Sequence, residues 1–169
     1  MGNVSANLAD LPPPICSTTE PAAYEVRPLR IGPLEIGFPV VQAALSGYSD
    51  GPMRRVARRM GASYTLAEVM IDRFILDLRD RSKTRHHMLV REEEHPVGAQ
   101  LMGSDPSDFP LAAKKLVAAG FDVIDINFGC PVKSAVGSCR GGYHLGQPLV
   151  ALEIVDRVRN AVPPEIPVT

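Results

Sequence analysis

Apolar runs alternate with helix-like segments along this chain, and this alternation restricts the fold more than any other feature. Short, largely apolar runs that predict strands lie at residues 40–44, 63–69, 96–102, 121–127 and 166–169. Strands separated by helices at this spacing form right-handed βαβ units, which build a parallel sheet. Strands that are apolar almost throughout fit a sheet covered on both faces. The pattern therefore predicts an α/β fold.

The helix-like segments carry their own start and stop signals. Residues 52–60 predict a basic helix that ends at Gly61, since glycine favours the left-handed conformation after a helix. Another helix is predicted to begin at Ser104 or Asp105, with Pro106 in its first turn. Helices are also predicted at residues 71–80 and from residue 148 onwards, and a solvated connection at residues 79–91.

Composition narrows the class of protein. The 169 residues are enough for one domain with a core, and 45% hydrophobic and 22% charged residues are ordinary for a soluble globular protein. A net charge of −1 gives no general signal for nucleic acid, and no apolar run approaches the roughly 18 residues of a membrane span. Residues 1–25 predict a disordered, proline-rich leader without a signal peptide. Three cysteines without zinc-type spacing indicate reduced thiols, a cytoplasmic location and no metal site.

The segment with the clearest chemical meaning is D-I-N-F-G-C-P-V-K at residues 125–133. It places Cys130 just past the C-terminal end of the apolar run 121–126. Catalytic residues gather at that end of the strands in parallel α/β proteins. A thiol with the ordinary pKa of about 8.5 is protonated at neutral pH but can still give up its proton. The alternative is that Cys130 is a small buried hydrophobic residue, as free cysteines often are.

This segment resembles the active-site signature of the tRNA-dihydrouridine synthases, flavin enzymes that reduce a uracil ring in transfer RNA. Further motifs of that family occur in the same order over residues 28–169. They are R-I-G-P-L at 30–34, A-A-L-S-G-Y-S-D at 43–50, E-V-M at 68–70 and Q-L-M-G-S-D-P at 100–106. The resemblance implies a (β/α)8 barrel of the TIM type, of which residues 26–169 supply about the first half.

The resemblance also implies the reaction and its participants. Uridine in tRNA is reduced to 5,6-dihydrouridine, with hydride from reduced FMN, NADPH as the reductant and a proton from Cys130. Asn127 is implied to orient the uracil, and Lys133 to face substrate phosphate. The residues implied to bind FMN follow the first strand or lie in the third: Ala44, Leu45, Ser46 and Gln100.

Each of these residues also has a structural alternative. Asn127 could stabilise a turn, Gln100 could be a polar residue at the barrel mouth, and residues 44–46 could be ordinary packing. Glu68 lies inside an apolar strand, and because buried carboxylates need partners, we predict an ion pair with Arg54. The arginines of the first helix form a stripe that could meet RNA phosphate or be a solvated face: Arg54, Arg55, Arg58 and Arg59.

The number of βα units leads to further expectations. A complete barrel typically needs about 250 residues, and a half barrel leaves unpaired parallel edges that invite pairing with another chain. We therefore expect a fragment of a longer enzyme that self-associates or is only marginally stable, and that is inactive by itself. Two other functions remain open. One is an FMN-dependent barrel oxidoreductase acting on a small molecule such as dihydroorotate, and the other is a non-catalytic half barrel used for association.

Overall fold

Parallel strands form the centre of the structure. A computed structural model describes residues 25–79 and 84–169, so the expected leader lies outside the described residues except for its last residue. The sheet has the order β3 (Val41–Gln42), β4 (Tyr64–Ile71), β5 (Val97–Met102) and β6 (Val123–Ile126). Every neighbouring pair is parallel, which confirms the predicted α/β fold.

The ends of the sheet are shorter than predicted. Of the expected first strand, residues 40–44, only Val41 and Gln42 pair with β4. The expected fifth strand, residues 166–169, is reduced to a parallel bridge between Val168 and Ile124. Each of these segments has a strand on one side only, so fewer hydrogen bonds hold it in a regular strand conformation.

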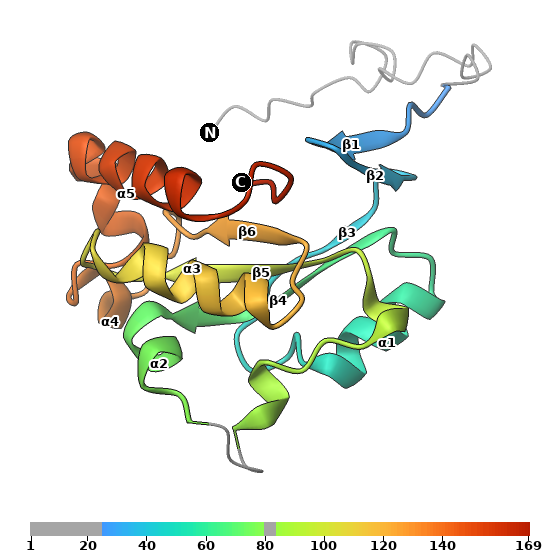
Figure 1. Ribbon diagram of the computed structural model, residues 1–169, viewed down its shortest axis with the longest axis horizontal. Coiled ribbons are helices and arrows are strands. Elements are labelled where there is room, and N and C mark those ends of the chain that lie inside the picture. The colour runs from blue at the N-terminus through green and yellow to red at the C-terminus, as the bar shows by residue number, and fades with distance from the viewer. Residues whose placement is uncertain (1–24, 80–83) are drawn as a thin grey trace, which may run out of the picture.

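Helices follow the strands and cover the sheet. They are α1 (Gly51–Arg59), α2 (Asp72–Asp77), α3 (Asp108–Ala118) and α5 (Pro148–Ala161). In Figure 1, α3 lies across β5 and β6, with α2 on one side and α5 on the other, and it contacts all four. Fully buried side chains fill the space beneath α3: Leu101, Phe109, Ala112, Ala113, Leu116, Ile124, Ile154 and Val158. Ala112 and Leu116 of α3, and Ile154 and Val158 of α5, recur every four residues, which is the spacing of one buried helix face.

Local signals place the starts of two helices correctly and one incorrectly. The Asp50 carboxylate accepts a hydrogen bond from the Met53 N–H at 2.9 Å and caps α1. Pro148 opens α5 as predicted. The predicted start of α3 at residues 104–106 is wrong, because the helix begins at Asp108. The Asp105 carboxylate instead accepts the Ser107 N–H at 2.8 Å, so it caps a turn before the helix.

A short ribbon precedes the sheet. Strands β1 (Leu29–Ile31) and β2 (Leu34–Gly37) pair antiparallel, with Gly32 in the left-handed region at φ 56°. Ile36 of the ribbon packs with Tyr64 and Val123, which lie near the N-terminal ends of their strands. The R-I-G-P-L motif at residues 30–34 thus lies in this ribbon, on the side of the sheet away from the strand C-termini.

Short helical turns complete the described chain. They are α4 (Lys133–Val136) and the 3-10 turns η2 (Arg85–His87), η3 (Glu92–Glu94) and η4 (Gly141–Gly146). None was predicted, because three to six residues give no readable period. Over residues 25–79 and 84–169, no helix has the length and apolar character needed to cross a membrane.

Candidate active site

A cleft of about 480 Å³ lies at the C-terminal side of the sheet. It is lined by Ala44, Ser46, Val69, Gln100, Ile126, Asn127, Phe128, Gly129 and Cys130. The structure therefore brings together most of the residues implied for the site, from β5 and from the ends of β3 and β6. Leu45 and Lys133, although both are described, lie outside this lining, and both are exposed. A hollow of about 590 Å³ near Ser63 and Pro96 lies at the opposite strand ends, where barrels carry stability rather than chemistry.

Two sets of backbone hydrogen bonds hold the loop that carries Cys130. The Asn127 side-chain oxygen accepts the N–H groups of Gly129 at 3.1 Å and Cys130 at 2.9 Å. On the other side, the Gly142 N–H donates to the Cys130 carbonyl at 2.9 Å. Gly141 has φ 57°, and a Cβ there would lie 2.8 Å from the Cys130 Cβ. Close contact with Cys130 therefore requires glycine at positions 141 and 142, and the backbone of this cysteine, whose thiol is free, has a defined position.

A chain of side-chain hydrogen bonds runs across the floor of the cleft. Asn127 Nδ2 donates to Gln100 Oε1 at 2.9 Å, and Gln100 Nε2 donates to Asp125 Oδ2 at 2.6 Å. The other oxygen of Asp125 accepts the Thr169 hydroxyl at 2.8 Å. The sequence motif did not lead us to predict a role for Asp125. A carboxylate inside an apolar strand needs a partner, and this was a signal that could have pointed to it.

The turn after β3 forms the opposite wall of the cleft. The buried Ser49 hydroxyl donates to the Ala43 carbonyl at 3.0 Å and accepts the Leu45 N–H at 2.8 Å. Across the turn, the Gly47 N–H donates to Glu68 Oε2 at 2.8 Å. Because the turn is tied both to itself and to β4, Ala44 and Ser46 are fixed where they line the cleft.

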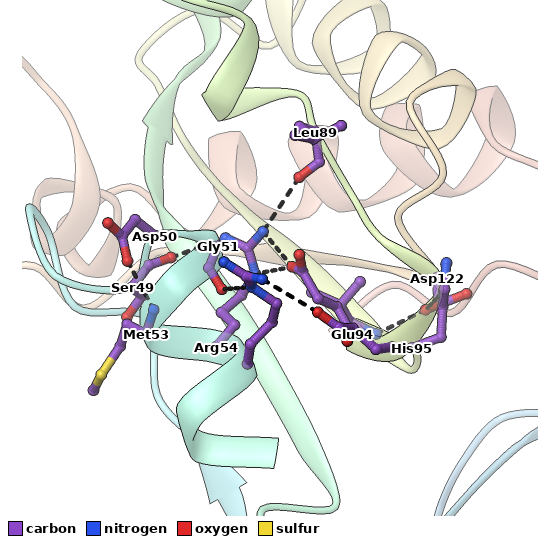
Figure 2. A network of polar contacts seen from close by, with 12 residues as sticks. Ser49, Asp50, Gly51, Met53, Arg54, Leu89, Glu94, His95 and Asp122 are labelled. Atoms are coloured by element: carbon purple, nitrogen blue, oxygen red, sulfur yellow. Dashed lines mark hydrogen bonds and ion pairs between the residues drawn. The ribbon is translucent and has the colours of Figure 1, made fainter. Parts of the chain in front are cut away.

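The predicted pair between Glu68 and Arg54 is wrong. Arg54 instead pairs with Glu94 of η3, whose Oε2 accepts Nε at 2.8 Å and Nη2 at 2.6 Å. Figure 2 shows this pair between the start of α1 and η3. The two side chains are only 4% and 1% exposed, and Arg54 Nη1 also donates to the Ser49 carbonyl at 3.0 Å. The arginine therefore supports the turn after β3 from behind.

The expected arginine stripe is correspondingly interrupted. Arg54 is neither solvated nor available to RNA, and Arg58 donates to the carbonyls of Ala62, Ser63 and His95. The sequence pattern could not reveal this, because it gives the helix face but not the loops that cover it. Glu68 lies 3.6 Å from the His87 ring. Burial and the neighbouring His86 lower the pKa of His87, and Glu68 opposes this shift.

A buried carboxylate explains one glycine of the Q-L-M-G-S-D-P motif. Asp72 follows β4 and is 1% exposed, and its burial raises the pKa of the carboxyl. A Cβ at Gly103 would lie 1.8 Å from Asp72 Oδ2. The Gly103 carbonyl also contacts the ring of the buried His144 at 3.1 Å. Over the described ranges, no group of three His, Cys, Asp or Glu side chains could hold a metal ion.

Comparison with known proteins shows which family this sequence belongs to. The family model described as dihydrouridine synthase (Dus) matches residues 41–169. The chain belongs to the dihydrouridine synthase family. It is 33% identical over 143 residues to tRNA-dihydrouridine synthase B of Pseudomonas aeruginosa and 34% identical over 141 residues to the Escherichia coli K12 protein of that name. Each alignment covers 83% of this chain, but the chain spans only 41% and 43% of those relatives.

Solved structures show the same fold with little sequence similarity. Histamine dehydrogenase from Rhizobium sp. 4-9 matches with a TM-score of 0.60 at 17% identity, over 85% of this chain and 31% of that one. Morphinone reductase matches with a TM-score of 0.54 at 15% identity, over 85% of this chain and 60% of that one. The fold is therefore that of a TIM-type (β/α)8 barrel, and this dihydrouridine synthase sequence forms its N-terminal part.

Proposed function

We propose that this chain supplies one half of the active site of a tRNA-dihydrouridine synthase. The proposed reaction is reduction of uridine in tRNA to 5,6-dihydrouridine, with FMN as the flavin, NADPH as its reductant and the cytoplasm as its location. The observation that carries the proposal is that Cys130 shares one cleft with Gln100 and with the turn residues Ala44 and Ser46. The named relatives, the tRNA-dihydrouridine synthases of Pseudomonas aeruginosa and Escherichia coli, support it.

The cleft residues fit a flavin ring in size and chemistry. An isoalloxazine has apolar faces and a polar edge, and the cleft combines small and apolar side chains with two carboxamides. Ala44 and Ser46 would lie against the ring, and Gln100 would meet its polar edge. The Leu45 N–H donates to the Ser49 hydroxyl, so Leu45 would contact the flavin through its exposed side chain. FMN, when bound, supplies the hydride.

Cys130 is proposed as the proton donor. Saturating the uracil double bond adds hydride to one ring carbon and a proton to its neighbour, and the proton must come from a group held beside the ring. The thiol is free, half-buried and on the cleft wall. Donation of the S–H proton to the ring carbon leaves a thiolate, which is restored by a proton from solvent. The target base must leave its stack to reach the cleft.

Two further residues are proposed to meet the tRNA. Asn127 uses its oxygen and one N–H within the protein, so one N–H remains for a uracil carbonyl. Lys133 begins α4 at the rim and is exposed, where an ammonium group can meet phosphate. Asn127 would thus hold the uracil base, and Lys133 would hold the tRNA phosphate backbone next to it.

The test is the dihydrouridine content of bulk tRNA after the codon for Cys130 is changed to alanine in the gene that carries this chain. We expect loss of dihydrouridine at one or more tRNA positions. A matched Cys139→Ser change, which alters the exposed thiol nearby, should leave the content unchanged. Unchanged tRNA in the Cys130→Ala strain would overturn the proposal and favour a flavin-dependent barrel enzyme acting on a small molecule.

The open sheet supports a second proposal, on the behaviour of the 169 residues alone. Strand β3 has a partner on one side only, and Phe38, Val40 and Val41 beside that open edge are 58%, 41% and 42% exposed. An edge of this kind pairs with other chains, so the isolated chain is proposed to self-associate and to lack turnover. Sedimentation velocity across a concentration series would show a rising mean mass, whereas a concentration-independent monomer would contradict the proposal.

A further inference from the structure

Asp125 and Gln100 face each other across two neighbouring strands. They are register partners in the parallel pairing of β5 and β6, so their side chains lie on the same face of the sheet. The 2.6 Å contact joins Gln100 Nε2 to Asp125 Oδ2. The second carboxylate oxygen is occupied by the Thr169 hydroxyl at 2.8 Å, so the carboxylate itself is held from both sides.

The chemistry of a carboxylate fixes the direction of the whole chain of hydrogen bonds. A carboxylate only accepts, so the NH2 end of Gln100 must face Asp125 and the carbonyl end must face away. Gln100 Oε1 then requires a donor, which is Asn127 Nδ2 at 2.9 Å. The Asn127 oxygen consequently points at the loop, where it accepts the N–H groups of Gly129 and Cys130.

We propose that Asp125 is a positioning residue, which sets the orientation of the Gln100 and Asn127 carboxamides and thereby holds the Cys130 loop. Reversal of the chain would turn Asn127 Nδ2 toward the loop and set a donor against the two backbone N–H groups. The two loop N–H groups oppose that arrangement at one end of the chain of bonds, and Asp125 opposes it at the other because it offers no donor to Gln100. The residue acts through Gln100 and Asn127, whereas Cys130, Gln100 and Asn127 line the cleft.

The same direction determines what the cleft presents to a ligand, a point that rests on the proposed function. Each carboxamide has two N–H groups, and one from Gln100 and one from Asn127 remain unused within this chain of bonds. Both residues line the cleft, so its floor offers donors. Carbonyl oxygens at the edge of an isoalloxazine or a uracil are acceptors, and Asp125 therefore selects for ligands with that edge.

The primary variant is Asp125→Asn, which keeps the shape but can present either a donor or an acceptor to Gln100. It is compared in the flavin-free chain, in a Cys16→Ser, Cys139→Ser background that leaves Cys130 as the only thiol. One readout is the rate of Cys130 alkylation by iodoacetamide, followed by mass spectrometry. The other is the set of side-chain NH2 signals of Gln100 and Asn127 in ¹⁵N-labelled protein. We expect alkylation to rise about fivefold, as loss of about one hydrogen bond implies, and the NH2 signals to double or broaden.

Two matched variants distinguish a change in the direction of these hydrogen bonds from a general disturbance of the structure around Asp125. Thr169→Val removes the other hydrogen bond to the same carboxylate and should leave both readouts unchanged. Gln100→Glu combined with Asp125→Asn restores a fixed direction, because the carboxylate introduced at position 100 accepts from the carboxamides on both sides of it. This double variant should return the alkylation rate to within about twofold of the parent and narrow the Asn127 signals, since about one hydrogen bond is regained.

The outcomes distinguish this inference from the proposed function. If Asp125→Asn leaves both readouts as Thr169→Val does, or if the double variant fails to restore them, the positioning role is overturned. Flavin and tRNA are absent from both assays, so a failure of the chain to bind FMN leaves this result intact. If Asp125→Asn does not unfold cooperatively, the double variant alone tests the positioning role. An alkylation rate that matches the parent supports the role, and a rate that does not match overturns it.

Discussion

Breaking the buried ion pair between Arg54 and Glu94 should be one of the most destabilising single changes in this chain. Both side chains are at most 4% exposed, and three of the hydrogen bonds of Arg54 lie within 3.0 Å of their acceptors, two on Glu94 and one on the Ser49 carbonyl. Removing one partner leaves a buried charge without compensation, which typically costs about 3–5 kcal/mol. That is a large share of the roughly 5–15 kcal/mol by which domains are stable.

The perturbation is Arg54→Met, Glu94→Leu and the double change. Each single variant should lose about 3–5 kcal/mol. Arg54→Met should lose more, because it also removes the shorter of the two hydrogen bonds to the Ser49 carbonyl, which keeps only the Glu68 N–H at 3.3 Å. The double variant buries neither charge, so it should lose less than Arg54→Met alone. The assay is urea unfolding followed by circular dichroism, which gives the free energy of unfolding by linear extrapolation.

The neighbouring residues provide the matched control. Arg55 and Glu93 also join α1 to η3, at 3.3 Å, but their side chains are 30% and 52% exposed. An exposed pair contributes about 0–1 kcal/mol, so Arg55→Met should cost under about 1 kcal/mol. Equal losses in Arg54→Met and Arg55→Met, or a double variant whose loss is the sum of its singles, would refute the reasoning.

Other predictions follow from buried groups near the cleft. Gly103→Ala should destabilise by about 3 kcal/mol because its Cβ would meet Asp72 Oδ2 at 1.8 Å, whereas Gly146→Ala, with nothing within 4 Å, should change the melting temperature little. Asp72→Asn should stabilise the chain at pH 7, because burial raises the pKa of Asp72 and its ionisation opposes folding; the gain should vanish below the unfolded pKa of about 3.8. Burial lowers the pKa of His87, so its contribution is present above the unfolded pKa of about 6.5 and is lost as pH falls below it. His87→Gln should flatten that part of a stability–pH curve, and an unchanged curve would contradict the assignment.

Periodic patterns in the sequence were sufficient for the architecture. The apolar runs predicted β4, β5 and β6 to within about two residues, because buried strands must be apolar whatever lies beside them. The start of α3 was misplaced because Asp105 and Pro106 satisfy the rules of a turn as well as those of a helix start. Sequence alone does not decide which of these two uses a cap residue will serve.

In the site, too, the residues of one local motif could be predicted from the sequence, whereas a pair far apart in the chain could not. Cys130, Asn127 and Asp125 belong to one strand end, so their motif fixes their relative positions, and Asn127 and Cys130 both line the cleft. Arg54 and Glu94 are forty residues apart, and Glu94 is the last residue of a three-residue turn with no pattern of its own. On sequence, Glu68 was the better candidate partner for Arg54, because it lies in an apolar strand. In the structure, Glu68 accepts the Gly47 N–H instead, and Arg54 pairs with Glu94 in the loop before β5. Local chemistry can thus be read from a motif, whereas a pairing that depends on loop closure requires the fold.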